Sequence, residues 1–196
     1  MKFAGRLLCP IFLVLLFYPC AFSQTPGDPD LRQDLFKPAF GVTANYSPNS
    51  FRGWGKVRNT RQFQLKLTYL HSNLELGNVS VVWGSELVVT SWIRYPIDGA
   101  SGPRENLFGL GVIPANFQIP LAKKNNGFFL TASAGFMVFN RVFPSGTGTR
   151  LNYLLDAGIG YRYQAGRRTI LQGGYKLRHI SNGNTGETNP GIDSQN

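Results

Sequence analysis

Hydrophobic and polar residues alternate along several stretches of the chain with the two-residue period of a β-strand. In the segment 61–71, four apolar side chains from Phe63 to Tyr69 share one face, and four polar ones from Gln62 to Thr68 share the other. Clusters of glycine, proline, asparagine and serine separate such stretches. The pattern predicts an all-β antiparallel protein with seven strands, at Ala39–Ser47, Arg61–His71, Val79–Tyr95 (bent near Gly84), Leu107–Ile119, Phe128–Val138, Leu151–Tyr163 and Thr169–Asn182.

The length of these segments favours a transmembrane β-barrel. Most exceed the roughly 5–6 residues that are typical of strands in soluble proteins and reach the ~9–11 that a tilted strand needs to cross a bilayer. Aromatic residues near the segment ends fit the girdles found at membrane interfaces, as at Tyr46, Trp54, Trp92, Tyr95 and Tyr163. The alternative is a soluble barrel of the lipocalin sort, whose apolar faces point inward.

The N-terminus has the plan of a secretory signal peptide. Two cations, Lys2 and Arg6, precede an apolar run (7–17), and small residues then mark a cleavage site. We therefore expect residues 1–23 to be removed, which leaves 24–196 as an outer-membrane β-barrel domain. Both cysteines lie in the predicted signal peptide, so the mature domain would have no disulfide and no thiolate. Bulky residues before the second cysteine disfavour the alternative of a lipoprotein anchor.

Composition narrows the classes of function. Charged residues make up 15 % of the chain and aromatic residues 13 %, with 23 glycines, which argues against disorder and against coiled coils. The formal net charge of +10 is compatible with nucleic acid, an anionic membrane or an acidic substrate as partner. Because the basic residues are scattered and the chain is expected to be exported, we expect no nucleic acid, and the sequence predicts neither a metal nor a cofactor.

Candidate chemistry lies at the end of the last predicted strand. His179 and Ser181 are two residues apart, so they share a face at about 7 Å between their Cα atoms. That face continues the apolar row of Tyr175 and Leu177, which would look into lipid. A base beside a serine hydroxyl can activate it as a nucleophile. A motif this short also occurs without function, as an inert polar pair at a strand end.

The C-terminal segment resembles the outer-membrane lipid A 3-O-deacylases of the PagL type, which are grouped with acyloxyacyl-hydrolase-like proteins. The resemblance rests on His179-x-Ser181-Asn182 and on Asn189-Pro190-Gly191-Ile192-Asp193, with weaker likeness in the blocks 135–139, 148–153 and 158–163. It implies an eight-stranded transmembrane barrel in the outer membrane of a Gram-negative bacterium, with an active site on its lipid-facing wall. It also implies hydrolysis of the ester that joins a 3-hydroxyacyl chain to lipid A of lipopolysaccharide.

Carried over onto this sequence, the resemblance makes Ser181 the nucleophile and His179 the general base. The family has a glutamate fourteen residues after the histidine, where this chain has Asp193. An aspartate can orient an imidazole, but its shorter side chain requires a closer backbone. Glu187 is the fallback acid.

Three further residues are expected to shape the site. Asn182, with the backbone N–H of Gly183, would form an oxyanion site, although Asn-Gly is also an ordinary turn sequence. Asn189 would shape the loop that returns the acid to the histidine. Basic residues near the membrane edge would help to hold the phosphates of lipid A, and the candidates are Lys176, Arg178, Arg141 and Arg150, each of which could equally be a solvated or lumen-facing charge.

The predicted strand count raises a problem, since single-chain bacterial barrels normally have an even number of strands. An eighth strand should begin just after Asp193, yet no apolar run follows. We therefore expect the C-terminal strand to be missing and the barrel to be incomplete at that end. The competing functions are a non-catalytic barrel, structural or adhesive, and a lipid A acyltransferase, for which the sequence offers no donor site. The oligomeric state is left open.

Overall fold

The computed structural model describes residues 20–21, 38–77, 79–98, 101–121, 126–143, 147–166 and 169–196. Apart from two residues, the predicted signal peptide lies outside these ranges. The described residues form one antiparallel sheet and no helix that is long and apolar enough to span a membrane. The strands are β1 (Cys20–Ala21), β2 (Ala39–Ser47), β3 (Ser50–Phe51), β4 (Arg61–Leu76), β5 (Val79–Pro96), β6 (Arg104–Pro120), β7 (Gly127–Phe143), β8 (Thr149–Gly166), β9 (Thr169–Ser181) and β10 (Ile192–Gln195).

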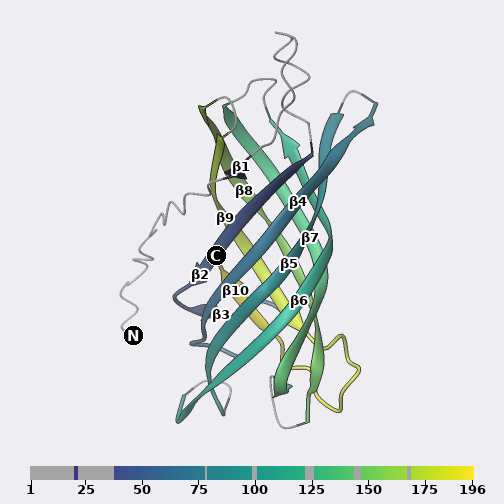
Figure 1. Cartoon of the computed structure of the whole chain (residues 1–196). Helices are drawn as coiled ribbons and strands as arrows, with labels where there is room; N and C mark the ends of the chain where they lie inside the picture. Colours follow the sequence, from purple (N-terminus) through teal and green to yellow (C-terminus); the bar gives the residue numbers. More distant parts are fainter. Residues whose placement is uncertain are drawn as a thin grey trace, which may run out of the picture.

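The sheet curves into a barrel-like form, with strands that cross it obliquely (Figure 1). Its hydrogen-bonded order is β2-β4-β5-β6-β7-β8-β9-β10-β3, with β1 beside β9. The strands at the two ends of this order, β2 and β3, are consecutive in the chain and separated only by Pro48 and Asn49. The predicted all-β antiparallel fold is therefore confirmed.

The predicted number of strands was wrong. All seven predicted segments are strands, but β3 and β10 extend the sheet and β1 pairs with β9. The strand expected to be missing after β9 begins at Ile192, and Asp193 lies within it rather than in the preceding loop. The sequence shows no alternating pattern for this strand, because Asp193, Ser194 and Gln195 are all polar. Backbone pairing to β9 and β3 defines β10 instead. The long strands also extend past their predicted ends, where the alternation fades.

The bend predicted in β5 coincides with a break in the pairing. The pairing of β5 with both neighbouring strands shifts register close to Gly84. The ladder with β4 shifts between Leu70 and Ser72, and the ladder with β6 shifts between Gly84 and Glu86. A Cβ at Gly84 would lie 2.7 Å from the Tyr69 carbonyl oxygen. Only glycine allows this close approach of two backbones at the bulge.

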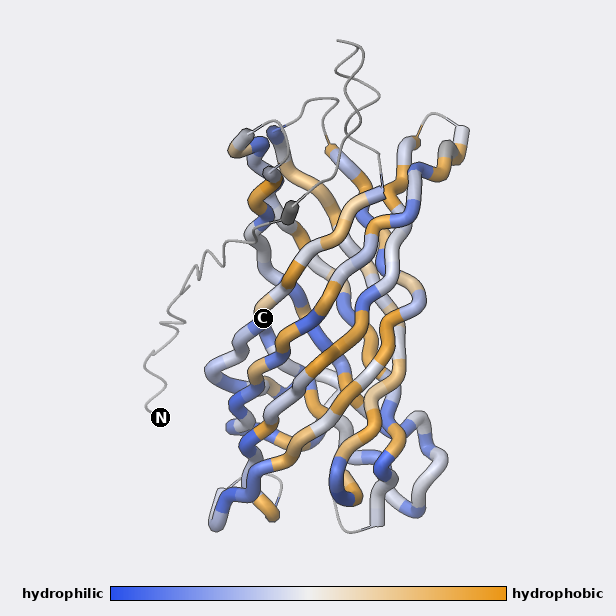
Figure 2. Tube along the Cα trace, in the orientation of Figure 1, coloured by the Kyte–Doolittle hydropathy of each residue, from blue (hydrophilic) through white to orange (hydrophobic). Residues whose placement is uncertain are grey.

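The two faces of the sheet have the polarity of a membrane barrel. Large apolar side chains are exposed along the outside of every long strand, among them Leu67, Leu110, Leu130, Leu155 and Leu177. Polar side chains are buried inside, including the fully buried Lys66 and Gln64. Figure 2 shows hydrophobic and hydrophilic positions alternating along the strands. This arrangement is the reverse of a lipocalin-type barrel, whose apolar faces point inward.

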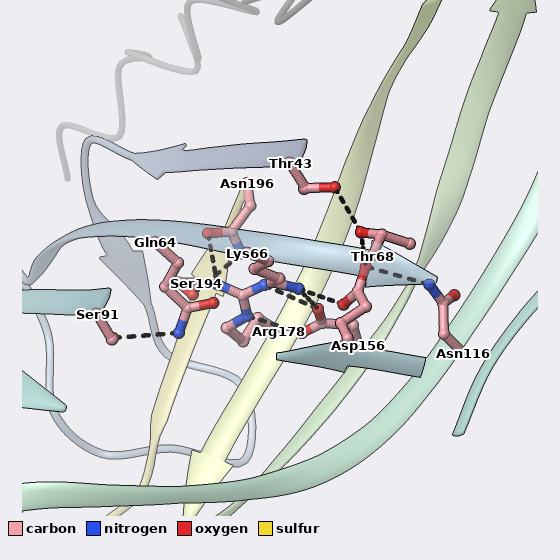
Figure 3. Close-up of polar contacts among 11 residues, drawn as sticks. Thr43, Gln64, Lys66, Thr68, Ser91, Asn116, Asp156, Arg178, Ser194 and Asn196 are labelled. Atoms are coloured by element: carbon pink, nitrogen blue, oxygen red, sulfur yellow. Dashed lines mark hydrogen bonds and ion pairs between the residues drawn. The ribbon is translucent and has the colours of Figure 1, made fainter. Parts of the chain in front are cut away.

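The interior is filled by two layers of side chains. One layer is polar and is centred on the ion pairs of Lys66 with Glu86 and of Arg178 with Asp156 (Figure 3). The other is an apolar cluster that lies behind the β9–β10 end of the sheet, formed by Val57, Val88, Ile93, Tyr95, Leu107, Ile113, Met137, Phe139, Phe143, Leu154, Ile180 and Ile192. Barrels of about eight strands are just wide enough to be filled in this way.

Candidate active site

The predicted catalytic residues lie at the end of β9, on the outward face of the wall. Tyr175 and Leu177 on the same face are 44 % and 48 % exposed, whereas Ile180, on the opposite face, is completely buried. His179 and Ser181 therefore stand outside the barrel-like sheet, as the alternation predicted. Ser181 is nevertheless only 7 % exposed, because the following loop and the neighbouring strands surround it.

His179 binds Asp193 on the adjacent strand. The two residues are directly opposite one another in the antiparallel ladder between β9 and β10, and 2.6 Å separates the imidazole Nδ1 from the carboxylate Oδ1. A carboxylate only accepts hydrogen bonds, so Nδ1 donates and Nε2 is left as the free base nitrogen. Direct cross-strand neighbours have Cβ atoms ~5 Å apart, which explains how an aspartate reaches the ring despite its short side chain.

The fallback acid, Glu187, lies elsewhere. It is an exposed residue in the connection 182–191. In the part of the chain that the structure describes, no hydrogen bond or ion pair joins it to His179. Asp193 is thus the carboxylate that contacts the imidazole.

A segment that the sequence did not single out completes the surroundings of Asp193. The backbone N–H of Gly55 donates to Asp193 Oδ2 at 2.7 Å, so both carboxylate oxygens are engaged. A Cβ at Gly53 would lie 2.5 Å from the same Oδ2, and one at Gly55 would lie 2.8 Å from the Asp193 backbone nitrogen. The two glycines let the loop 52–57 close over the carboxylate. In the sequence, only the spacing of the two glycines in Gly53-Trp54-Gly55 could have indicated that this loop packs closely against another segment.

Trp54, between these glycines, lies beside the imidazole. Its ring makes an edge-to-face contact with His179 at 5.8 Å between centroids, yet 84 % of the residue is exposed. The sequence pattern assigned this tryptophan to an interface girdle and did not connect it with the histidine. The contact places a large, exposed apolar surface next to the imidazole.

Ser181 is close to His179 along the strand but is not bonded to it. Among the described residues, no hydrogen bond joins the Ser181 hydroxyl to the imidazole. Catalytic hydrogen bonds are often long or absent without substrate and tighten in the reacting complex. The two side chains share one face at a spacing that a change of side-chain rotamer can bridge.

Asn182 and Asn189 form the frame of the loop after β9. The Asn182 amide group donates to the Thr188 carbonyl at 2.8 Å and accepts from the Asn184 N–H at 3.0 Å. The side-chain oxygen of Asn189 accepts the backbone N–H of Asn182 at 3.1 Å. Gly183 follows at a positive φ of 62°, the left-handed conformation that glycine adopts without strain. These bonds hold the loop that leads to β10.

The four basic candidates separate into two groups. Lys176 and Arg178 lie on the lumen side of β9, and Arg178 binds Asp156 there at 2.7 Å, so it cannot meet a lipid outside. Arg141 and Arg150 are exposed. In the described residues, no group of three or more His, Cys, Asp or Glu side chains could hold a metal ion.

A serine, an imidazole and a carboxylate on one face of a β-sheet wall are the components of a serine-type hydrolase site. The comparison with protein families is more specific. The model of the lipid A 3-O-deacylase (PagL) family matches residues 38–196, and the chain belongs to this family. The resemblance seen in the C-terminal segment is thereby confirmed, and it extends over the strands from β2 to β10. No curated protein and no solved structure matches the chain.

Proposed function

We propose that this protein is an outer-membrane esterase that removes a 3-hydroxyacyl chain from lipid A of lipopolysaccharide by a serine mechanism. Membership of the lipid A 3-O-deacylase family supports deacylation of lipid A in general. The observation that carries the mechanism is the 2.6 Å hydrogen bond between His179 and Asp193, on the same outward face as Ser181. A lipid substrate can reach this face without leaving the membrane.

In the proposed reaction, His179 Nε2 takes the proton of the Ser181 hydroxyl as Oγ attacks the acyl carbonyl carbon. The tetrahedral oxyanion is held by the Asn182 amide and the Gly183 N–H. The intermediate collapses, and the imidazolium gives its proton to the departing sugar hydroxyl. A water molecule, deprotonated by His179, then releases the 3-hydroxy fatty acid and restores Ser181. Asp193 stabilises the imidazolium in both steps.

Two observations support the location. The outer wall is apolar over the length of the long strands, as a bilayer requires. The connections at the site's end (48–49, 52–60, 97–103, 144–148 and 182–191) include three of seven residues or more, whereas none at the other end (77–78, 121–126 and 167–168) exceeds six. Outer-membrane barrels have short periplasmic turns and longer extracellular loops. The site would then face the outer leaflet, where lipopolysaccharide resides.

The test is mass spectrometry of lipid A from a Gram-negative host that has no deacylase of its own. Expression of the wild-type chain should remove one 3-hydroxyacyl chain, and Ser181→Ala should abolish this loss. Ser133→Ala is the matched control, because Ser133 is a buried lumen-side serine whose hydroxyl has no hydrogen-bond partner among the described residues. Unchanged lipid A with a folded wild-type protein would instead favour a non-catalytic barrel, structural or adhesive.

A further inference from the structure

An aromatic row crosses the outside of four strands at the same end of the sheet as the site. Tyr46, Phe63, Trp92 and Phe108 are successive cross-strand partners on β2, β4, β5 and β6. All except Trp92 are among the exposed large side chains of the protein, and Trp92 is half-buried. An outward band of aromatic residues is typical of the boundary between the hydrocarbon region and the lipid headgroups.

A cationic row lies one step closer to the loops. Arg61 and Arg94 are direct cross-strand partners on the same outward face, and both are exposed. Like charges directly opposite each other destabilise a sheet. In the part of the chain that the structure describes, neither guanidinium has an ion pair, so no acidic group offsets this repulsion.

A third arginine is fixed next to this pair. The guanidinium of Arg104, at the start of β6, donates to the backbone carbonyl of Asn59, two residues before Arg61. Asn59 has a positive φ of 57°, an uncommon conformation for a residue with a side chain. The acid that follows Arg104, Glu105, lies on the opposite face of β6 and pairs with Arg141 at 3.4 Å. Among the described residues, none of the three outward arginines has an ion pair with an acidic side chain.

The orientation of Trp92 connects the aromatic and cationic rows. Its indole N–H donates to the Asn106 side chain at 3.1 Å, and Asn106 is the cross-strand partner of Arg94. The polar edge of the indole therefore points toward the arginines and away from the apolar wall. Apolar side chains, aromatic rings and cations follow one another in the order in which a lipid presents its acyl chains, its interface and its phosphates. In Figure 2 the lower ends of these strands are largely hydrophilic.

This patch is connected to the candidate active site through β3. Ser50 pairs with Ser194 of β10, next to Asp193, and its hydroxyl accepts the backbone N–H of Thr60 at 3.0 Å. Arg61 follows directly. The backbone of Arg61 is therefore about two strand spacings, or roughly 10 Å, from β10. That separation is within the width of a phosphorylated disaccharide headgroup.

We propose that Arg61, Arg94 and Arg104 bind a phosphate group of the phosphorylated glycolipid whose acyl ester is placed at Ser181. Guanidinium groups bind phosphate through short, charge-assisted and often paired hydrogen bonds. A dianionic phosphate between Arg61 and Arg94 would replace their repulsion by two attractions. The inference rests on the proposed function, because it makes this patch the headgroup subsite of that enzyme.

The experiment measures lipid binding by the full chain in detergent micelles, in the Ser181→Ala background, so that no turnover occurs. The probes are lipid A with its phosphates and the same lipid after enzymatic dephosphorylation. Arg61→Gln combined with Arg94→Gln should weaken binding of the phosphorylated lipid about tenfold or more and leave binding of the dephosphorylated lipid unchanged. Lys123→Gln combined with Lys124→Gln removes the same charge from the sequence between β6 and β7 and should change neither affinity.

Equal affinity of the double arginine variant and its parent for phosphorylated lipid A would overturn the proposal, as would an equal loss for both lipids. Displacement of the lipid by inorganic phosphate at matched concentration would assign the patch to a soluble anion instead. Folding is checked by thermal unfolding, where Arg94→Gln alone should raise the midpoint because it relieves the repulsion with Arg61. A wild-type protein that binds lipid A through the arginines but does not hydrolyse it would refute the proposed function and keep this inference.

Discussion

Two neighbouring residues of β9 each bind a carboxylate, on opposite sides of the same wall. Arg178 faces the lumen and holds Asp156 of β8 through two hydrogen bonds, from Nε at 2.7 Å and from Nη2 at 2.8 Å. His179 faces outward and holds Asp193 of β10 at 2.6 Å. The inner pair is fully removed from solvent, whereas the histidine side chain is 19 % exposed.

The surroundings of the two pairs decide what each can do. Asp156 is also 3.8 Å from Lys66, which in turn binds Glu86 at 2.8 Å, so these two cations and two anions are linked to one another in the lumen layer (Figure 3). Asn116 and Thr68 complete the hydrogen bonds of Glu86. Each of these four charges has a partner of opposite sign within the layer, which gives the layer a structural role. The outer pair leaves one imidazole nitrogen open and has a serine beside it, so it can move a proton.

Among changes to the two carboxylate pairs, Asp193→Asn gives the largest expected effect on catalysis. The amide would accept from Gly55 but would no longer stabilise an imidazolium, and it favours the wrong tautomer of His179. In triads such a change lowers turnover by about a thousandfold or more with little change in the fold. The measurement is the rate of fatty-acid release from lipid A by the purified protein in micelles, with thermal unfolding as the check of folding.

Glu187→Gln is the control for that variant. It removes one acidic charge from the same C-terminal segment, at a residue that does not contact His179, and should leave the rate within about twofold of wild type. If the two variants lost activity equally, the contact between Asp193 and His179 would not be the one that matters.

Asp156→Asn should have the opposite balance of effects from Asp193→Asn. We expect a large loss of stability and a small loss of activity per folded molecule. It removes the carboxylate that pairs with the buried Arg178. Breaking a buried ion pair on one side costs about 3–5 kcal/mol. The free energy of unfolding is measured by urea titration in phospholipid vesicles. The double variant Asp156→Leu with Arg178→Met removes both charges and should recover part of the loss. A variant as stable as wild type would show that the inner pair is not structural.

The two sides of β9 also differ in how far the sequence predicted them. Alternation placed His179 and Ser181 outside and Arg178 on the opposite face, because a strand leaves no freedom in this respect. The identity of the pairs required the register between strands. Asp156 is directly opposite Arg178 on β8, and Asp193 is opposite His179 on β10. Register depends on bulges and loops far from the residues concerned, so the inner ion pairs could not be derived from the pattern.

The strand β10 and the loop over it show the same limit at the site itself. A strand of four mostly polar residues has no pattern of its own and is formed by pairing on both edges. The contribution of Gly55 depends on a contact 138 positions away in the chain. Local sequence therefore placed His179 and Ser181 side by side on the outward face, but the backbone group that fixes Asp193 required the three-dimensional structure.

Gly55→Ala gives the smallest effect of these predictions. It tests how much the position of the Asp193 carboxylate matters when the carboxylate itself is kept. The new methyl group would meet the backbone of Gly191, Ile192 and Asp193 at 2.8–2.9 Å, so the loop 52–57 must withdraw and Asp193 loses one hydrogen bond. A displacement of about 1 Å near a reacting group can cost up to roughly a hundredfold in rate. We expect a ten- to hundredfold fall in turnover, smaller than for Asp193→Asn, because the carboxylate is still present.

The matched control is Gly166→Ala at the end of β8, where a Cβ would meet nothing within 4 Å. It should leave both turnover and stability unchanged. In combination with Asp193→Asn, Gly55→Ala should add little, since both changes act on the same carboxylate and such effects are not additive. Fully additive losses would mean that the loop acts on the site independently of Asp193, for example through Trp54. The contacts of Asp193 with Gly55 and with His179 would then contribute to activity separately.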